Sequence, residues 1–102
     1  MYRKKITDAI RQAVSSLGSD VSVYLYGSEA RGEAKKDSDI DILVVIDKNN
    51  ISLEDEMRIT APLYKIELSS GVLINTIFFT KKDWGRIVSP FYENVTQDAI
   101  AL

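Results

Sequence analysis

The chain contains neither cysteine nor histidine among its 102 residues. The lack of cysteine excludes a disulfide framework and a thiolate metal site, and it is typical of proteins from reducing compartments. The lack of histidine removes the commonest general base and the commonest zinc ligand. Acid–base or metal chemistry in this protein therefore depends mainly on carboxylates.

Long apolar runs are missing too. No apolar stretch approaches the roughly 20 residues that span a bilayer, and the longest, residues 40–46, is interrupted by Asp41. Residues 1–14 carry basic side chains but no continuous apolar segment of the kind found in a signal peptide. We therefore expect a cytoplasmic protein with no membrane segment.

The sequence also lacks an excess of positive charge. Its 13 basic and 15 acidic residues give a formal net charge of −2, which argues against a direct nucleic-acid-binding surface. Hydrophobic residues make up 45% of the chain and charged residues 27%, a balance typical of one compact domain, expected here over residues 1–102. Because so small a domain buries only a modest core, a partner protein or a homo-oligomer would add stability.

Hydrophobic patterns predict elements in the order α-β-β-α-β-α-α. The expected segments are a helix ending before Gly18, strands over Val21–Tyr26, Asp39–Ile46 and Val72–Phe79, a helix between Ser52 and Gly71, a short helix from Thr80 that carries Trp84, Ile87 and Val88, and a last helix from Phe91 to about Asp98. Ser89 and Pro90 are expected to cap and begin the last helix. The final four residues can add a brief edge strand.

Local signals refine the middle helix and the strand after it. Ser52 to Asp55 form a capping-box pattern, and Pro62 is expected to kink or split the helix. Residues 72–79 are apolar apart from Asn75 and Thr76, which predicts a central strand. The buried stripe of the helix is expected to consist of Leu53, Met57, Ala61, Tyr64 and Leu68.

Asp39 and Asp41 lie one residue apart at the start of the second predicted strand. Because alternate side chains of a strand share a face, both carboxylates are expected to point the same way. Two adjacent like charges repel each other unless a positive charge lies between them. Oxygen ligands without histidine or cysteine favour magnesium or manganese over zinc, and magnesium commonly completes its shell with substrate phosphates. The pair therefore indicates a phosphate-bearing substrate.

A glycine–serine pair ends the first predicted strand. Gly27 lets the backbone approach a ligand closely, and the N–H groups of the following turn, with the Ser28 hydroxyl, can bind phosphate. Arg31 lies one turn further on and either stabilises phosphate charge or anchors the loop. Taken singly, each pattern is more often structural, as a turn, a solvated strand edge or a surface residue. Their joint occurrence, with ten residues between Ser28 and Asp39, favours a site in which phosphate cradle and metal pair face each other.

The residues from Gly27 to Ile42 follow the pattern G-S-x-A-R-G-x-A-x-x-x-S-D-I-D-I. This pattern resembles the signature of minimal nucleotidyltransferases in the DNA polymerase β-like superfamily, and the resemblance extends to the length of the chain and the order of its elements. It implies an α+β fold of the polymerase β palm type, with a small mixed β-sheet flanked by helices. It also implies magnesium-dependent transfer of AMP, or another nucleoside monophosphate, from ATP or another NTP to an acceptor hydroxyl, with release of pyrophosphate.

Under this resemblance, Asp39 and Asp41 would be the catalytic metal ligands. Gly27 and Ser28 would hold the nucleotide phosphates, and Arg31 would be a weaker contact. Small proteins of this type commonly occur beside a helical HEPN-domain partner as toxin–antitoxin pairs. The resemblance therefore implies an antitoxin that modifies its partner, in some cases by adenylylating a tyrosine.

The next predicted strand departs from the family pattern. Active members usually supply a third carboxylate there, whereas residues 72–79 contain none, and Asn75 is the nearest polar candidate. Three consequences stay open: the acceptor reacts without a strong base, the partner supplies the missing group, or the domain binds nucleotide and partner with little turnover. The alternative function is thus a binding module that neutralises its partner by complex formation. Modification of small antibiotics is less expected, because no additional acceptor-binding domain is evident.

Overall fold

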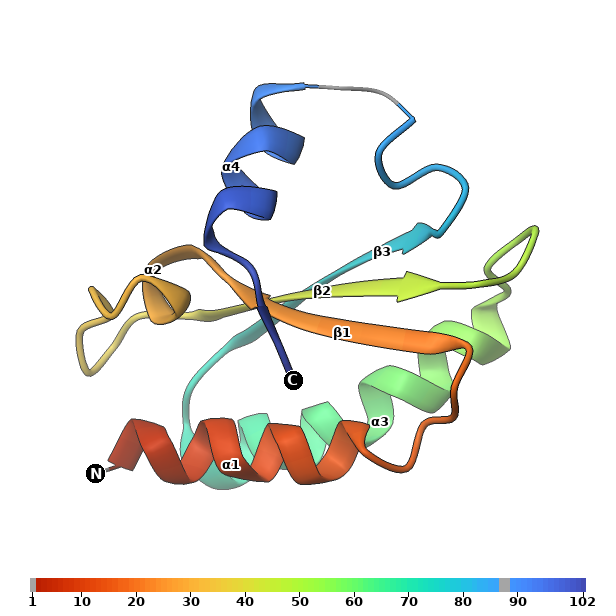
Figure 1. Cartoon of the computed structure of the whole chain (residues 1–102). Helices are drawn as coiled ribbons and strands as arrows, with labels where there is room; N and C mark the ends of the chain where they lie inside the picture. The colour runs from red at the N-terminus through yellow and green to blue at the C-terminus, as the bar shows by residue number, and fades with distance from the viewer. Residues whose placement is uncertain (1, 87–88) are drawn as a thin grey trace.

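The computed structural model describes residues 2–86 and 89–102, which form a four-stranded sheet with helices on both faces (Figure 1). The elements are α1 (Tyr2–Val14), β1 (Val21–Tyr26), α2 (Gly27–Ala30), β2 (Ile40–Ile46), α3 (Leu53–Ser70), β3 (Ile74–Thr80), α4 (Pro90–Asp98) and β4 (Ile100–Ala101). The predicted α+β class, with a small mixed sheet flanked by helices, is confirmed. Within the described part of the chain, no helix is both long and apolar enough to cross a membrane.

The strands lie in the order β3-β2-β1-β4. β1 pairs antiparallel with β2 and β4, whereas β2 and β3 run parallel. The prediction that β3 is central is therefore wrong, because it lies at the edge of the described sheet. Residues 72–79 are apolar because helices pack on both faces of the sheet, not because a strand pairs with β3 on each side. At the start of β3, Glu67 of α3 accepts a hydrogen bond from the Ile74 N–H (2.8 Å).

Helices α1 and α3 cover one face of the sheet, and α4 lies over the other (Figure 1). The core under α1 and α3 includes Ile6, Ile10, Val23, Leu25, Ile40, Ile42, Val44, Ile46, Ile59 and Leu63. The smaller core under α4 contains Leu43, Val45 and Val95, with Tyr24, Tyr26, Phe79 and Trp84 packed against it. The alternation along β2 therefore directs its even-numbered residues toward α1 and α3, and places Asp41 on the α4 face.

The stripe predicted to be buried on α3 faces away from the core, so this prediction is wrong. Exposed fractions are 72% for Leu53, 60% for Met57, 57% for Tyr64 and 66% for Leu68, and Ala61 is exposed as well. The buried residues of the helix are Asp55, Ile59 and Leu63. Both rows have helical spacing, so periodicity alone does not choose between them. The inward-facing Asp55, which pairs with Lys48 (2.8 Å), belongs to the row that packs on the sheet.

The predicted capping box at the start of α3 is confirmed. Ser52 Oγ accepts the Asp55 N–H and Asp55 Oδ2 accepts the Ser52 N–H, both at 3.1 Å. Pro62 lies inside one continuous helix, so the predicted split does not occur. Gly71 ends the helix in a left-handed conformation (φ 74°), as expected for a C-terminal glycine.

The last part of the chain agrees with the sequence prediction at two of three points. Ser89 caps α4, and Pro90 is its first residue. The brief edge strand is present as β4. The predicted helix after Thr80 is wrong for residues 81–86, which form turns, while residues 87–88 lie outside the described part of the chain.

Candidate functional site

The junction of β1 and α2 lies directly against the Asp41 carboxylate. Gly27 has φ of +75°, and a Cβ atom placed on it would lie 2.5 Å from Asp41 Oδ2. Tyr26, the residue before it, pairs with Asp41 across the β1–β2 ladder. The glycine is thus required twice, by its left-handed backbone and by the space that the carboxylate occupies. The structure thus brings the glycine–serine turn next to Asp41, and the role of these residues in binding nucleotide stays a prediction.

Asp39 and Asp41 converge on a single amide. Asn75 Nδ2 donates to Asp39 Oδ2 (3.1 Å) and to Asp41 Oδ1 (3.2 Å). The parallel register of β2 and β3 produces this contact, because Asn75 lies beside Asp41. The two carboxylates therefore share one side of the sheet, and Asn75 occupies the position on the neighbouring strand that faces both.

The electrostatics of the aspartate pair are unbalanced. No lysine or arginine in the described part of the chain forms an ion pair with Asp39 or Asp41, whereas Asp8 and Asp55 each have two and Asp98 has one. Burial raises the pKa of the Tyr26 hydroxyl to about 12, and the negative charge of Asp41 contributes to the same shift. The pair thus has no positively charged partner among residues 2–86 and 89–102.

The donor set fits a hard divalent cation with incomplete protein ligation. Two carboxylates and an amide are oxygen donors of the kind that magnesium and manganese accept. Among the described residues, no group of three or more acidic, histidine or cysteine side chains is placed to hold a metal. Asp39 and Asp41 would therefore supply one or two ligands, and the remainder would come from substrate and solvent, as is usual for magnesium.

Ser28 has the position expected of a phosphate contact. Its side chain is half-buried, and its hydroxyl has no hydrogen-bond partner among the described residues. Its carbonyl oxygen accepts the Glu33 N–H (2.9 Å), which closes the turn after α2. The serine backbone is therefore fixed while its hydroxyl stays available. Its role in phosphate binding remains a prediction.

Arg31 has the geometry of the loop anchor, one of the two roles considered for it. Its guanidinium pairs with Glu33 (2.7 Å) and with Asp98 of α4 (2.8 Å). Hydrogen bonds to Glu33 and then to Asp98 raise the pKa of Arg31, so the group stays protonated. A phosphate contact by Arg31 remains a prediction and would compete with these two carboxylates. The pocket beside it, of about 180 Å³, is lined by Tyr26, Gly27, Arg31, Phe91, Asn94, Val95 and Asp98.

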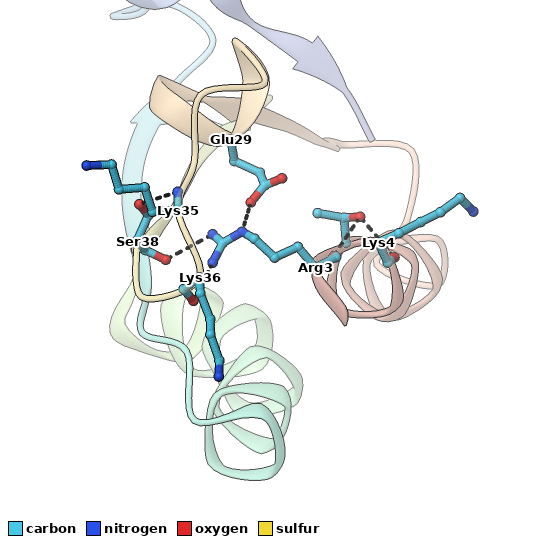
Figure 2. A network of polar contacts seen from close by, with 7 residues as sticks. Arg3, Lys4, Glu29, Lys35, Lys36 and Ser38 are labelled. Atoms are coloured by element: carbon cyan, nitrogen blue, oxygen red, sulfur yellow. Dashed lines mark hydrogen bonds and ion pairs between the residues drawn. The ribbon is translucent and has the colours of Figure 1, made fainter. Parts of the chain in front are cut away.

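The segment that leads into Asp39 is fixed by Arg3, a residue that sequence reasoning missed. Figure 2 shows its guanidinium between α1, α2 and the loop before β2. Arg3 Nε donates to Glu29 Oε1, Nη1 to the Lys36 carbonyl (3.1 Å) and Nη2 to the Ser38 carbonyl (2.9 Å). Only 12% of the Arg3 side chain and 16% of the Glu29 side chain are exposed. A basic residue near the N-terminus gives no signal of such contacts.

Arg3 also lines a larger hollow of about 780 Å³. It is lined by Arg3, Ala34, Lys36, Asp37, Ser70, Gly71 and Val72. It includes none of the glycine, serine, aspartate or asparagine side chains of the candidate site. The largest hollow therefore does not coincide with the candidate site, whose residues lie at the junction of β1 and α2 and where β2 and β3 begin.

Comparison with known proteins agrees with this geometry. Residues 7–100 match the sequence family described as the nucleotidyltransferase domain. The chain belongs to this family. As a nucleotidyltransferase domain it is assigned to the transferases, and domains of this family generally use divalent metals. No curated protein matches the sequence.

Two solved structures have the same fold. One, described as a minimal nucleotidyltransferase, is 26% identical with a TM-score of 0.61, and the match covers 98% of this chain and 91% of that chain. The other is a nucleotidyltransferase structure from Sulfolobus solfataricus, 23% identical with a TM-score of 0.56, covering 95% of this chain and 76% of that chain. The resemblance to minimal nucleotidyltransferases predicted from residues 27–42 is thus confirmed.

Proposed function

We propose that this nucleotidyltransferase domain transfers AMP, or another nucleoside monophosphate, from ATP or another NTP to a hydroxyl of a partner protein, with magnesium or manganese as cofactor. The observation that carries the proposal is the convergence of Asp39 and Asp41 beside the Gly27 turn, where no lysine or arginine of the described residues pairs with them. The proposed partner is a helical HEPN-type protein, and the pair would act as a toxin–antitoxin system.

Each residue of the site has a defined task in this reaction. Asp39 and Asp41 would hold the metal, which when bound polarises the α-phosphate and offsets charge on the departing pyrophosphate. Gly27 and Ser28 would hold the β- and γ-phosphates through N–H and hydroxyl donors. The acceptor oxygen forms a bond to the α-phosphorus while the bond to pyrophosphate breaks, and the acceptor proton passes to solvent because β3 supplies no carboxylate.

Asn75 supports a second candidate function. Its amide donates to both carboxylates, so Asp39 and Asp41 have a shared hydrogen-bond donor even without a metal. A binding module of this kind would neutralise its partner by forming a complex, with little or no transfer. In the catalytic case, rotation of the amide by about 180° would present its oxygen to the cation, since amide nitrogen and oxygen exchange places in such a rotation.

The first experiment incubates the protein with α-labelled ATP, magnesium and candidate helical HEPN-type partner proteins. We expect label on the partner with the wild type and none with an Asp39→Ala/Asp41→Ala variant. Equal or absent label in both samples contradicts the catalytic proposal.

The second experiment measures neutralisation of the partner in cells by an Asp39→Asn/Asp41→Asn variant. Circular dichroism and co-purification first establish that the variant folds and binds. A variant that binds but does not neutralise supports transfer. A variant that neutralises as well as the wild type supports the binding module instead.

A further inference from the structure

The outward face of α3 carries an uncharged row of large side chains. Leu53, Met57, Tyr64 and Leu68 are each more than half exposed, and the small residue Ala61 lies between them. Their spacing of four, four, three and four residues places them on one side of the helix. Contiguous apolar surface of this kind commonly marks a protein–protein interface. This row, called the α3 stripe, is separate from Gly27, Asp39 and Asp41.

We propose that the α3 stripe pairs with the α3 stripe of a second copy of this chain, antiparallel about a two-fold axis at Ala61. The order of side chains supports this arrangement, because it reads nearly the same in both directions. Leu53 would meet Leu68 of the other copy, Met57 would meet Tyr64, and Ala61 would meet Ala61. A two-fold interface requires a patch that is complementary to itself. The small residue at the centre allows the two helices to approach closely.

Charges beside the stripe support the same partner and orientation. Glu54 and Lys65 are exposed on the same flank of α3, and neither forms an ion pair among the described residues. In the antiparallel pair, Glu54 lies about three residues, or about 4.5 Å of helix rise, from Lys65 of the other copy. Long side chains bridge that distance. The flank carries one negative and one positive charge. A second copy of the same flank therefore complements it better than a uniformly acidic or basic protein would.

The stripe has the composition of an interface core. Its five residues carry no charge, and interface cores are depleted in charged side chains while their rims are polar. Burial of the stripe would also remove the four large exposed side chains of α3 from contact with water. A chain of this length buries only a modest core, and α3 is buried only on the side that packs on the sheet. The second copy would bury its outward side.

The test measures the mass of the purified full chain by sedimentation velocity over a concentration series. We expect the wild type to form a dimer and Ala61→Glu to raise the dissociation constant at least tenfold, because two carboxylates would meet at the axis. Gln97→Glu is the matched control, because it adds the same charge at an exposed position of α4 on the opposite face of the sheet, and it should dimerise as the wild type does. Ala61 is exposed, so circular dichroism should show the same fold in all three proteins.

A charge exchange tests the orientation. Glu54→Lys alone and Lys65→Glu alone should each weaken the dimer several-fold, and the double variant should restore it. A wild type that stays monomeric throughout the series overturns the proposal and assigns the stripe to a different protein. A dimer that is indifferent to Ala61→Glu overturns it as well. Failure of the double variant to restore association overturns the antiparallel pairing.

Discussion

Asp55 and the pair Asp39/Asp41 are acidic sites built in opposite ways. Asp55 is 6% exposed and receives hydrogen bonds from Lys48 Nζ (2.8 Å) and from the Ser52 N–H (3.1 Å). These contacts, the one to Lys48 first, lower its pKa from 3.8 to about 2. Asp39 and Asp41 lie closer to solvent and share only the amide of Asn75.

The difference separates a carboxylate that stabilises the fold from two carboxylates that have no cationic partner among the described residues. Asp55 is balanced by the chain itself, so its charge contributes to folding at neutral pH. The charges of Asp39 and Asp41 repel each other until a cation joins them. Substitutions at the two places should therefore have opposite effects on activity and on stability.

The largest effect is expected from Asp41→Asn. Loss of a metal ligand should lower nucleotide transfer on the order of a thousandfold, since metal stabilisation of the transition state amounts to several kcal/mol. The melting temperature without metal should stay equal or rise, because one of two repelling charges is removed. Labelled-ATP assays and thermal melts measure the two quantities. Asp55→Asn is the comparison and should show the reverse pattern, with transfer by folded protein retained and the melting temperature lowered.

Asn75→Asp should raise the rate of nucleotide transfer. A carboxylate beside Asp41 would supply the general base that β3 lacks, and such a base contributes about a hundredfold or more. Without metal the three carboxylates repel, so the melting temperature should fall, and magnesium should restore it. Rates and melts with and without magnesium measure both effects. An unchanged transfer rate would mean that the acceptor proton does not limit turnover.

Gly27→Ala should damage the site through its backbone. The new Cβ would lie 2.5 Å from Asp41 Oδ2, and φ is +75°, so the variant should lose about 2 kcal/mol of folding free energy. Urea unfolding measures the loss. Gly32→Ala is the matched control: φ there is +73°, but a Cβ meets nothing within 4 Å. Strain should appear in both variants, and loss of magnesium binding only in Gly27→Ala.

Arg3→Lys tests how the loop before Asp39 is held. A lysine retains a charge near Glu29 but cannot bond both loop carbonyls, so about 1.5 kcal/mol of stability should be lost. Transfer should fall about tenfold, because Asp39 follows the loosened segment. Urea unfolding and transfer rates at saturating nucleotide measure these changes. Lys5→Arg, at an exposed position of the same helix, should alter neither.

The smallest effect concerns pH and Asp55. Because the folded pKa of Asp55 lies near 2, below its usual value of 3.8, its contribution is present above about pH 4 and is lost as the pH falls toward 2. Asp55→Asn should flatten the dependence of the melting temperature on pH within that window. Thermal melts between pH 2 and 5 measure it. An identical slope in wild type and variant would contradict the assignment.

Sequence patterns predict the candidate site better than they predict the packing around it. The positions of Gly27, Asp39 and Asp41 follow from strand alternation and from a short return of the chain, both of which are local. The contacts of Arg3 join residues 26 to 35 positions apart, and no local pattern encodes them.

The orientation of α3 was mispredicted for a related reason. The helix has two apolar rows, and only contact with the sheet and the pair between Lys48 and Asp55 distinguishes them. The edge position of β3 likewise depends on strand order, which composition does not contain. The apolar pattern of a strand indicates whether its two faces are buried, but it does not indicate how many strands pair with it.

The hydrogen bond between Glu67 and Ile74 covers one end of the open edge of β3. The β2–β3 ladder runs from the Ile40 N–H bonded to Leu73 to the Lys81 N–H bonded to Ile46, and its alternation turns every second N–H of β3 outward. Edge strands without charge attract other strands, and residues 74–80 contain no charged side chain. Glu67 occupies the first outward donor and adds negative charge at the point where another chain would begin to pair.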